Sequence, residues 1–291
     1  MKVEISHPGK LMFPAAGVTK GQLASYYERV APWMLPHVKG RPISMQRFPE
    51  GVDGYGFFHK DVPEHFPAWV RRVEVAKRGG RVTHAVAANP ETLVYLANQN
   101  CVTPHVWLSR SDRLRQPDRL VFDLDPSVHD FPAVRRAARA LGGLLRELGL
   151  EPYAMTTGSR GLHLWVPLRR GPDFSEVREF ARDVGLVMAA RHPDELTMEA
   201  RKAKRGDRIL IDVNRNAYAQ TAVPPYAVRP RPTAPVAMPL DWEELSDSRL
   251  RADRWTLANA FRRLAAKGDP WSDMGRRAKG LAEPRRRLRA R

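Results

Sequence analysis

Cysteine is almost absent from this sequence, since Cys101 is the only one among 291 residues. A single cysteine excludes an intrachain disulfide and a zinc site built from cysteines. The sequence also lacks any run of about 18 uncharged apolar residues, the length that a membrane-spanning helix needs. Its first residues, MKVEISHPGKLMF, contain no apolar signal core. We therefore expect a cytoplasmic protein with no membrane partner.

Acidic residues are outnumbered by basic ones. The chain has 32 Asp and Glu against 49 Lys and Arg, which gives a formal net charge of +17. A surface this basic attracts polyanions, so nucleic acid is the first hypothesis for the partner, with an association with the nucleoid. The alternative from charge alone is a solvated basic surface without a ligand.

Two of the few aspartates, Asp123 and Asp125, lie one residue apart at the end of the apolar stretch RLVFDLDP, residues 119–126. Alternate residues of a strand point to the same face, so the two carboxylates project side by side and repel each other. A hard divalent cation would compensate this repulsion. A simple turn at Pro126 is the alternative.

A second apolar stretch, RILID, also ends on an acid, Asp212. Three carboxylates at neighbouring strand ends could hold two Mg²⁺ or Mn²⁺ ions about 4 Å apart, the arrangement used for in-line nucleotidyl transfer. Asp123, Asp125 and Asp212 are therefore candidate catalytic residues and candidate metal ligands.

Between these stretches lies TTGSRGLHLWVPL, residues 156–168, where a turn rich in glycine and hydroxyl groups precedes an alternating strand. Glycines let the backbone approach a ligand, and Arg160 supplies a fixed charge for phosphate. The Walker A pattern is absent. Taken alone the segment also fits an ordinary hairpin turn, but its position between the two acidic strands favours triphosphate binding.

Periodicity predicts helices over residues 131–148 and about 174–191. Thr19 and Gln22 form a capping-box pattern that begins another helix, for which Pro32 is the expected end. The order strand, helix, strand, strand, helix, strand indicates an α+β fold. We expect the proline-rich residues 223–240 to lie extended on the surface, and the last residues, EPRRRLRAR, to form a disordered basic tail.

The three motifs, in this order, resemble the archaeo-eukaryotic primase superfamily, and more closely the polymerase domain of bacterial DNA ligase D, which acts in non-homologous end joining. Similarity extends over nearly the whole chain, through HPGKLMFPAAGVTKGQLASYY, FFHK, PHVWLSR, FDLDP, TGSRGLHLWVPL, RILIDVNRN and TAVPPYAVRPRPTAPVAMPLDWEEL. The resemblance implies a primase-polymerase core in which an RRM-like catalytic sheet lies beside a second α/β sub-module.

The resemblance supports the metal assignment and implies further site residues. The predicted nucleotide-binding residues are His105, Thr157, Ser159, Arg160, Gly161, His163, Arg205 and Arg229. Two positions depart from the family, which often has serine at Thr157 and lysine at Arg160. A planar guanidinium meets phosphate differently from an ammonium, so nucleotide affinity is expected to differ. Gln46 also stands where a lysine is expected, with Arg47 as a substitute.

The resemblance also implies DNA contacts. Lysines at Lys10 and Lys20 match those that recognise a 5′-phosphate, and Lys20 falls in the first turn of the Thr19-capped helix, where free N–H groups attract anions. Without the resemblance, both lysines fit a solvated surface. Phe57 and Phe58 are expected to face opposite ways, so that one or both stack on template bases; packing in a core on two sides is the alternative.

The sequence thus predicts a single end-joining polymerase domain over 1–291, with a DNA-end-binding part over roughly 1–110, a catalytic core over 111–245 and C-terminal helices with a basic tail over 246–291. Its expected activity is template-directed nucleotidyl transfer that fills gaps and extends 3′ ends at double-strand breaks, with a preference for ribonucleotides. Expected partners are DNA ends with a 5′-phosphate, NTP or dNTP, Ku and an ATP-dependent DNA ligase. Alternatives are a primase-polymerase that starts chains without a primer and a non-catalytic end-bridging module.

Overall fold

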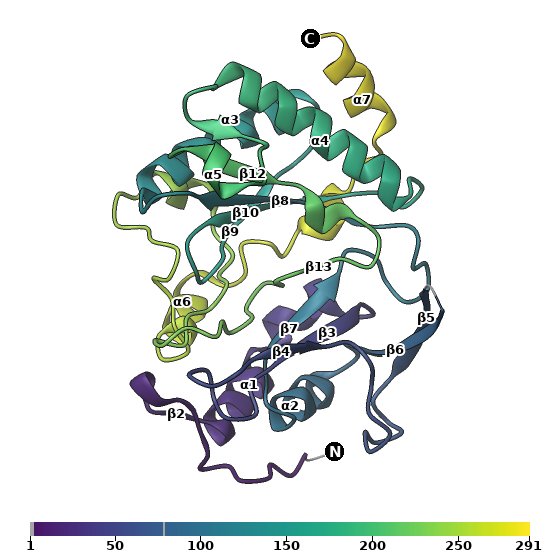
Figure 1. Cartoon of the computed structure of the whole chain (residues 1–291), viewed down its shortest axis with the longest axis vertical. Helices are drawn as coiled ribbons and strands as arrows, with labels where there is room; N and C mark the ends of the chain where they lie inside the picture. Colours follow the sequence, from purple (N-terminus) through teal and green to yellow (C-terminus); the bar gives the residue numbers. More distant parts are fainter. Residues whose placement is uncertain (1–2, 78) are drawn as a thin grey trace. The chain divides into compact units, whose positions relative to one another are not determined.

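The computed structural model describes residues 3–77 and 79–291, which form two compact units (Figure 1). The first unit takes the described residues up to 112 together with 221–238 and 255–268, and the second takes 113–220, 239–254 and 269–291. Each unit therefore draws on segments far apart in the sequence. None of the described helices has both the length and the apolar character needed to cross a membrane.

The first unit is built on an antiparallel sheet with the strand order β13-β7-β3-β6-β5, to which β4 adds by pairing with β3. Helices α1 and α2 pack against each other, and α2 packs on β7. Its elements are β1 (Leu11–Phe13), η1 (Pro14–Ala16), β2 (Val18–Thr19), α1 (Lys20–Val38), β3 (Pro42–Arg47), β4 (Phe57–His59), β5 (Arg72–Lys77), β6 (Gly80–Val86), α2 (Pro90–Asn98), β7 (Cys101–Trp107), β13 (Thr221–Ala222) and α6 (Ala260–Lys267).

The second unit contains a five-stranded sheet in the order β11-β12-β8-β10-β9, antiparallel except for the β11–β12 pair. Helices α3 and α4 both lie on one face of it (Figure 1). Its elements are β8 (Arg119–Pro126), α3 (Phe131–Glu147), β9 (Tyr153–Thr156), β10 (Leu162–Pro167), α4 (Phe174–Arg191), β11 (Leu196–Thr197), α5 (Lys202–Arg205), β12 (Ile209–Asp212), η2 (Asn214–Asn216), η3 (Trp242–Ser246), η4 (Met274–Arg277) and α7 (Ala282–Arg289).

The strand order β12-β8-β10-β9, with α3 after β8 and α4 after β10, confirms the predicted RRM-like arrangement within an α+β fold. Apolar residues of β8 such as Phe122 and Leu124 are fully buried. The intervening Asp123 and Asp125 remain partly exposed on the other face. The alternation of β8 therefore places the carboxylates on the face that the two helices leave open.

The helix that begins after Thr19 runs further than the sequence predicted. The capping box with Gln22 is present, but α1 continues to Val38 and contains Pro32 and Pro36, so the expected end at Pro32 is wrong. Proline removes one helical hydrogen bond. Here the helix buries Val30 and Val38 completely, so tertiary packing outweighs the local cost.

The proline-rich segment 223–240 has no helix and only isolated β-bridges, as expected, but apart from residues 229–233 it is buried rather than spread on the surface. Side chains satisfy its carbonyls: the Tyr26 hydroxyl donates to the Tyr226 carbonyl at 2.9 Å, and the Thr103 hydroxyl donates to the Val228 carbonyl at 2.6 Å. Because each proline also lacks an N–H, the segment can be buried without a partner strand.

The C-terminal residues form a helix, so the prediction of a disordered tail is wrong. Within α7, Arg287 pairs with Glu283 at 2.8 Å, one helical turn away. Leu281 and Leu288 are buried against the rest of the second unit. The two buried leucines, seven residues apart, and the Glu283–Arg287 ion pair stabilise the arginine-rich stretch as a helix.

Candidate active site

The candidate site lies on the open face of the second unit's sheet, where β12 pairs antiparallel with β8. Asp212 is the direct partner of Asp123 in this register, and His163 of β10 faces Asp123 from the other side. Directly paired residues of neighbouring strands point to the same face. The backbone therefore brings Asp123, Asp125 and Asp212 to one face, although they lie far apart in the sequence.

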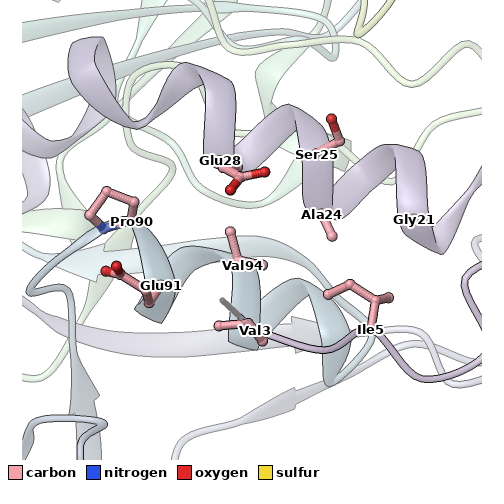
Figure 2. Close-up of a pocket in the computed structure, with 9 residues that line it drawn as sticks. All are labelled: Val3, Ile5, Gly21, Ala24, Ser25, Glu28, Pro90, Glu91 and Val94. Carbon is pink, nitrogen blue, oxygen red and sulfur yellow. The ribbon is translucent and has the colours of Figure 1, made fainter. Parts of the chain in front are cut away.

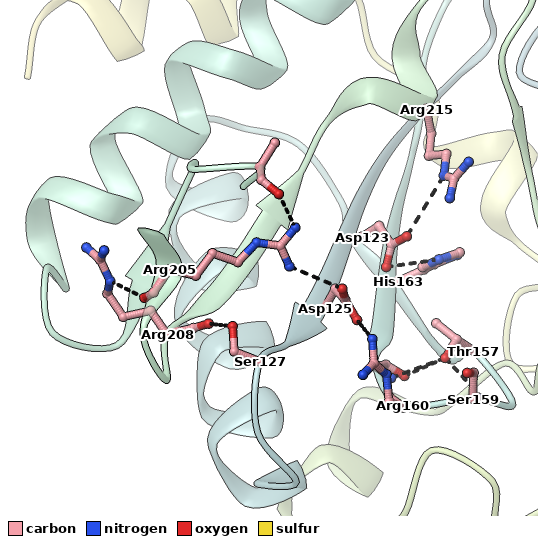
Figure 3. Close-up of polar contacts among 12 residues, drawn as sticks. Asp123, Asp125, Ser127, Thr157, Ser159, Arg160, His163, Arg205, Arg208 and Arg215 are labelled. Atoms are coloured by element: carbon pink, nitrogen blue, oxygen red, sulfur yellow. Dashed lines mark hydrogen bonds and ion pairs between the residues drawn. The ribbon is translucent and has the colours of Figure 1, made fainter. Parts of the chain in front are cut away.

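Asp123 and Asp125 turn toward basic side chains (Figure 3), and Asp212 turns toward a backbone N–H. Asp123 lies 3.4 Å from His163 Nε2 and 3.9 Å from Arg215 Nε through its two oxygens. Asp212 Oδ1 accepts a hydrogen bond from the Asn214 N–H at 2.8 Å. In the described part of the chain, no group of three or more His, Cys, Asp or Glu side chains gathers tightly enough to hold a metal ion in this arrangement.

Asp125 is held between two arginines. Arg160 Nη2 lies 3.1 Å from one of its oxygens, and Arg205 Nη1 lies 3.4 Å from the other. Arg205 is 6% exposed and also donates to the carbonyls of Glu199 and Ala200, at 3.0 and 2.6 Å. The negative charge of the site is thus balanced by fixed cations, which are suited to binding phosphate oxygens as well.

The turn before β10 is closed by Thr157. Its hydroxyl donates to the Gly161 carbonyl at 3.1 Å and accepts from the N–H groups of Gly161 and Ser159 at 3.2 and 3.3 Å. Gly158 has a φ of +64°, a conformation that favours glycine. Thr157 therefore holds the turn's shape, a role that a serine hydroxyl could also fill.

His163 is buried at 3% exposure, and within the described residues its Nδ1 atom has no hydrogen-bond partner. A buried polar atom without a partner is costly, and the role of His163 stays a prediction. Arg215 was not predicted as a site residue. Its position three residues after Asp212, in RILIDVNRN, was the available signal.

His105 and Arg229 belong to the first unit, whereas the other predicted nucleotide contacts belong to the second. His105 is 7% exposed, and its Nε2 lies 3.2 Å from Gln46 Oε1. The Phe58 ring packs edge-on against His105, with the ring centroids 5.0 Å apart. Gln46, Phe58 and His105 therefore form one cluster, while the roles of His105 and Arg229 stay predictions.

The two phenylalanines differ in their surroundings. Phe58 is 54% exposed, whereas Phe57 is partly covered, since its ring stacks on Tyr55 at 6.2 Å and lies 5.8 Å from the Arg47 guanidinium. Phe58 therefore offers an accessible ring of the kind that stacks on a base.

The two predicted end-binding lysines lie together. The Lys20 N–H donates to the Lys10 carbonyl at 2.8 Å, and Lys20 Nζ donates to the Ser6 hydroxyl at 2.9 Å. Burial, with the nearby charge of Lys10, lowers the pKa of Lys20. Both effects disfavour the charged form of the Lys20 amine. A bound anion would favour the charged form and so offset the effect of burial.

A separate pocket of about 240 Å³ lies between α1, α2 and the N-terminal segment (Figure 2). Val3, Ile5 and Val94 give it an apolar wall, and the carboxylates of Glu28 and Glu91 lie toward one end. Its acidic character does not fit a phosphate, which distinguishes it from the lysine pair on the same helix.

A family model described as "LigD, primase-polymerase domain" matches residues 19–271. Among characterised proteins, the chain is 32% identical over 253 residues to the multifunctional non-homologous end joining protein LigD of Mycolicibacterium smegmatis, covering 86% of this chain and 33% of that protein. It is 33% identical over 290 residues to the Pseudomonas aeruginosa protein of the same name, covering 98% of this chain and 34% of that one. The chain thus spans about a third of these relatives.

Among solved structures, the polymerase domain from Mycobacterium tuberculosis ligase D in complex with DNA superposes with a TM-score of 0.89. The two are 31% identical, and the match covers 95% of this chain and 99% of the other. The similarity therefore includes both units and not only the catalytic sheet.

Proposed function

Because this chain belongs to the LigD primase-polymerase domain family, we propose that it is a template-directed nucleotidyltransferase that fills gaps and extends 3′ ends at DNA double-strand breaks. The reaction joins the α-phosphate of an NTP or dNTP to a primer 3′-hydroxyl and releases pyrophosphate. We also propose that it uses ribonucleotides and that it acts in the cytoplasm, at the nucleoid.

The observation that carries the proposal is the register of β8 and β12, which places Asp123 and Asp125 on the same face as Asp212. Their oxygens are the donors that Mg²⁺ and Mn²⁺ prefer, so the donor set fits two such ions. When bound, the ions would activate the 3′-hydroxyl and stabilise the leaving pyrophosphate. Arg160 and Arg205 now pair with Asp125, and Arg215 with Asp123, and they would have to release these two carboxylates.

Once they have released Asp125, Arg160 and Arg205 can bind the triphosphate. Arg160 projects from the Thr157 turn beside Asp125, and Arg205 is fixed by two backbone carbonyls at the other side of the same carboxylate. Fixed guanidinium groups bind phosphate oxygens in a defined geometry, so both would orient the triphosphate. The Nδ1 atom of the buried His163 would form a hydrogen bond with the nucleotide.

The first unit supplies features that suit a DNA end. The Lys10 and Lys20 pair at the start of α1 supports recognition of a 5′-phosphate through its two ammonium charges, since the first N–H groups of the helix already donate to Lys10, Pro8 and Thr19. Phe58 supports stacking on a template base. Ku and an ATP-dependent ligase are proposed partners, because the relatives are named for end joining.

The decisive experiment uses a gapped duplex with and without a 5′-phosphate at the gap, assayed with NTP or dNTP across Mg²⁺ and Mn²⁺. We expect filling that the 5′-phosphate stimulates and that Asp123→Ala abolishes. Asp183→Asn, an exposed acid on α4, is the matched control and should fill the gap normally. Undiminished filling by Asp123→Ala would refute the metal assignment.

Two further substrates separate the alternatives. Product on an unprimed single-stranded template would indicate a primase-polymerase that starts chains. Binding of ends without extension by the wild-type protein would indicate a bridging module. The central proposal expects extension of primed substrates in the same assay.

A further inference from the structure

The second unit contains a basic and aromatic pocket that none of the predicted contacts uses. It has a volume of about 440 Å³ and is formed by the first turns of α4 and the segment after η2. The residues that line it are Phe174, Ser175, Arg178, Glu179, Arg182, Ala217 and Tyr218.

Three arginines give the pocket its charge. Arg178 and Arg182 are exposed on α4, and the guanidinium of Arg115 lies 5.4 Å from the centre of the Tyr218 ring. Neither Arg115 nor Arg182 forms an ion pair with any residue that the structure describes. The one acid in the lining, Glu179, lies 3.8 Å from Arg285. The uncompensated charge of the pocket is therefore positive.

Tyr218 supplies a partly exposed ring at the same place. Its ring meets Phe174 edge-on, with centroids 5.6 Å apart, which fixes its orientation. An aromatic ring beside several arginines is the combination that proteins use to bind a nucleic-acid strand, with the ring against a base and the guanidinium groups on phosphates.

The pocket is joined directly to the carboxylate site. Arg178 Nη2 donates to Asn214 Oδ1 at 2.9 Å, and the N–H of Asn214 donates to Asp212. Asn216, next to the lining residue Ala217, bonds to the N–H and carbonyl of Val121, two strand residues before Asp123. The pocket and the carboxylates are therefore held by the same short segment after β12.

We propose that this pocket binds the primer strand a few nucleotides behind its 3′ end, with phosphates on Arg178 and Arg182 and a base or sugar against Tyr218. The inference rests on the proposed function for the identity of the strand. The binding itself is a property of the pocket and can be measured without catalysis.

The test is fluorescence anisotropy of a labelled primer–template without any 5′-phosphate, titrated from 50 to 200 mM KCl. Arg182→Ala should weaken binding and lower the slope of log K against log salt by about 1, the effect of one lost phosphate contact. Arg191→Ala, at the last turn of the same helix, is the matched control and should keep both values.

Tyr218 is tested by a pair of substitutions. Tyr218→Phe keeps the ring and should bind as the wild type does, whereas Tyr218→Leu should weaken binding at least about fivefold. A 5-iodouracil placed three nucleotides from the primer's 3′ end should crosslink to Tyr218. Unchanged affinity and salt slope in Arg182→Ala, or a crosslink that maps elsewhere, would overturn the inference.

These outcomes are distinct from those of the proposed function. Failure of the wild-type protein to extend primers would refute the polymerase proposal, while the anisotropy result would still decide the pocket. Normal extension combined with unaltered binding by Arg182→Ala and Tyr218→Leu would refute the pocket alone.

Discussion

Gly161 lies at the point where the nucleotide turn meets the acidic strand, so Gly161→Ala should damage the site directly. A Cβ at this position would lie 2.0 Å from the Leu124 carbonyl oxygen, whereas real Cβ contacts begin at about 3.0 Å. The start of β10 and the β8 backbone must therefore separate by about 1 Å. Leu124 stands between Asp123 and Asp125, so this shift moves both carboxylates.

A displacement of about 1 Å at a reacting centre can lower the rate about 100-fold, and overpacking costs about 1–3 kcal/mol of stability. We expect Gly161→Ala to show both effects. The assay is single-nucleotide extension of a primer–template, measured well below the melting temperature of each variant, with chemical denaturation to give the free energy of unfolding.

Two other glycines provide controls. At Gly142 a Cβ would lie 2.0 Å from a ring carbon of Trp242, and at Gly143 it would meet nothing within 4 Å. Gly142→Ala should therefore lose stability but keep its extension rate once folded. Gly143→Ala should keep its rate and gain up to about 1 kcal/mol, because alanine is the better helix former. Wild-type extension by Gly161→Ala would show that the backbone shift does not reach Asp123 and Asp125.

Three further predictions concern the core of the first unit. The Tyr27 hydroxyl donates to the Val102 carbonyl at 2.6 Å and accepts from the Val228 N–H at 3.2 Å, so Tyr27→Phe should cost about 1–3 kcal/mol in urea unfolding; an unchanged midpoint would contradict this. Burial lowers the pKa of His84 below 6.5. The contribution of the neutral ring to the free energy of unfolding is therefore complete above about pH 6.5 and is lost as the pH falls through the folded-state pKa. His84→Gln should flatten the pH dependence of the free energy of unfolding over that range. Burial raises the pKa of Cys101 to about 12, so a thiol reagent at pH 8 should label it only after unfolding, and rapid labelling of the folded protein would oppose this.

Local sequence patterns were sufficient to predict the helices and strands that position the site. The alternation of β8 and the helical periods of α3 and α4 could be read directly, and the structure has α3 at Phe131–Glu147 and α4 at Phe174–Arg191. These elements form because their own residues separate an apolar face from a polar one. The sequence placed Asp212 at a neighbouring strand end but did not predict its direct pairing with Asp123, since register across strands distant in sequence leaves no local signal.

The predictions that the structure contradicts concern segments in which tertiary contacts outweigh the local conformational preference of the sequence. Pro32 lies within α1 because the helix has a buried face on both sides of it, and residues 223–240 are buried because distant hydroxyls satisfy their carbonyls. Neither partner can be identified from the local sequence. Arg215 was missed for a similar reason, because only the turn of η2 aims it at Asp123.

Joint binding of divalent cations by Asp123, Asp125 and Asp212 can be measured by electron paramagnetic resonance of Mn²⁺ in the presence of a non-hydrolysable NTP. We expect Asp212→Asn to weaken Mn²⁺ binding at least about tenfold, since even residues that only support metal ligands cause losses of that size, while Asp183→Asn should bind Mn²⁺ as the wild type does. Equal Mn²⁺ affinity in the wild type and Asp212→Asn would show that Asp212 is not a metal ligand.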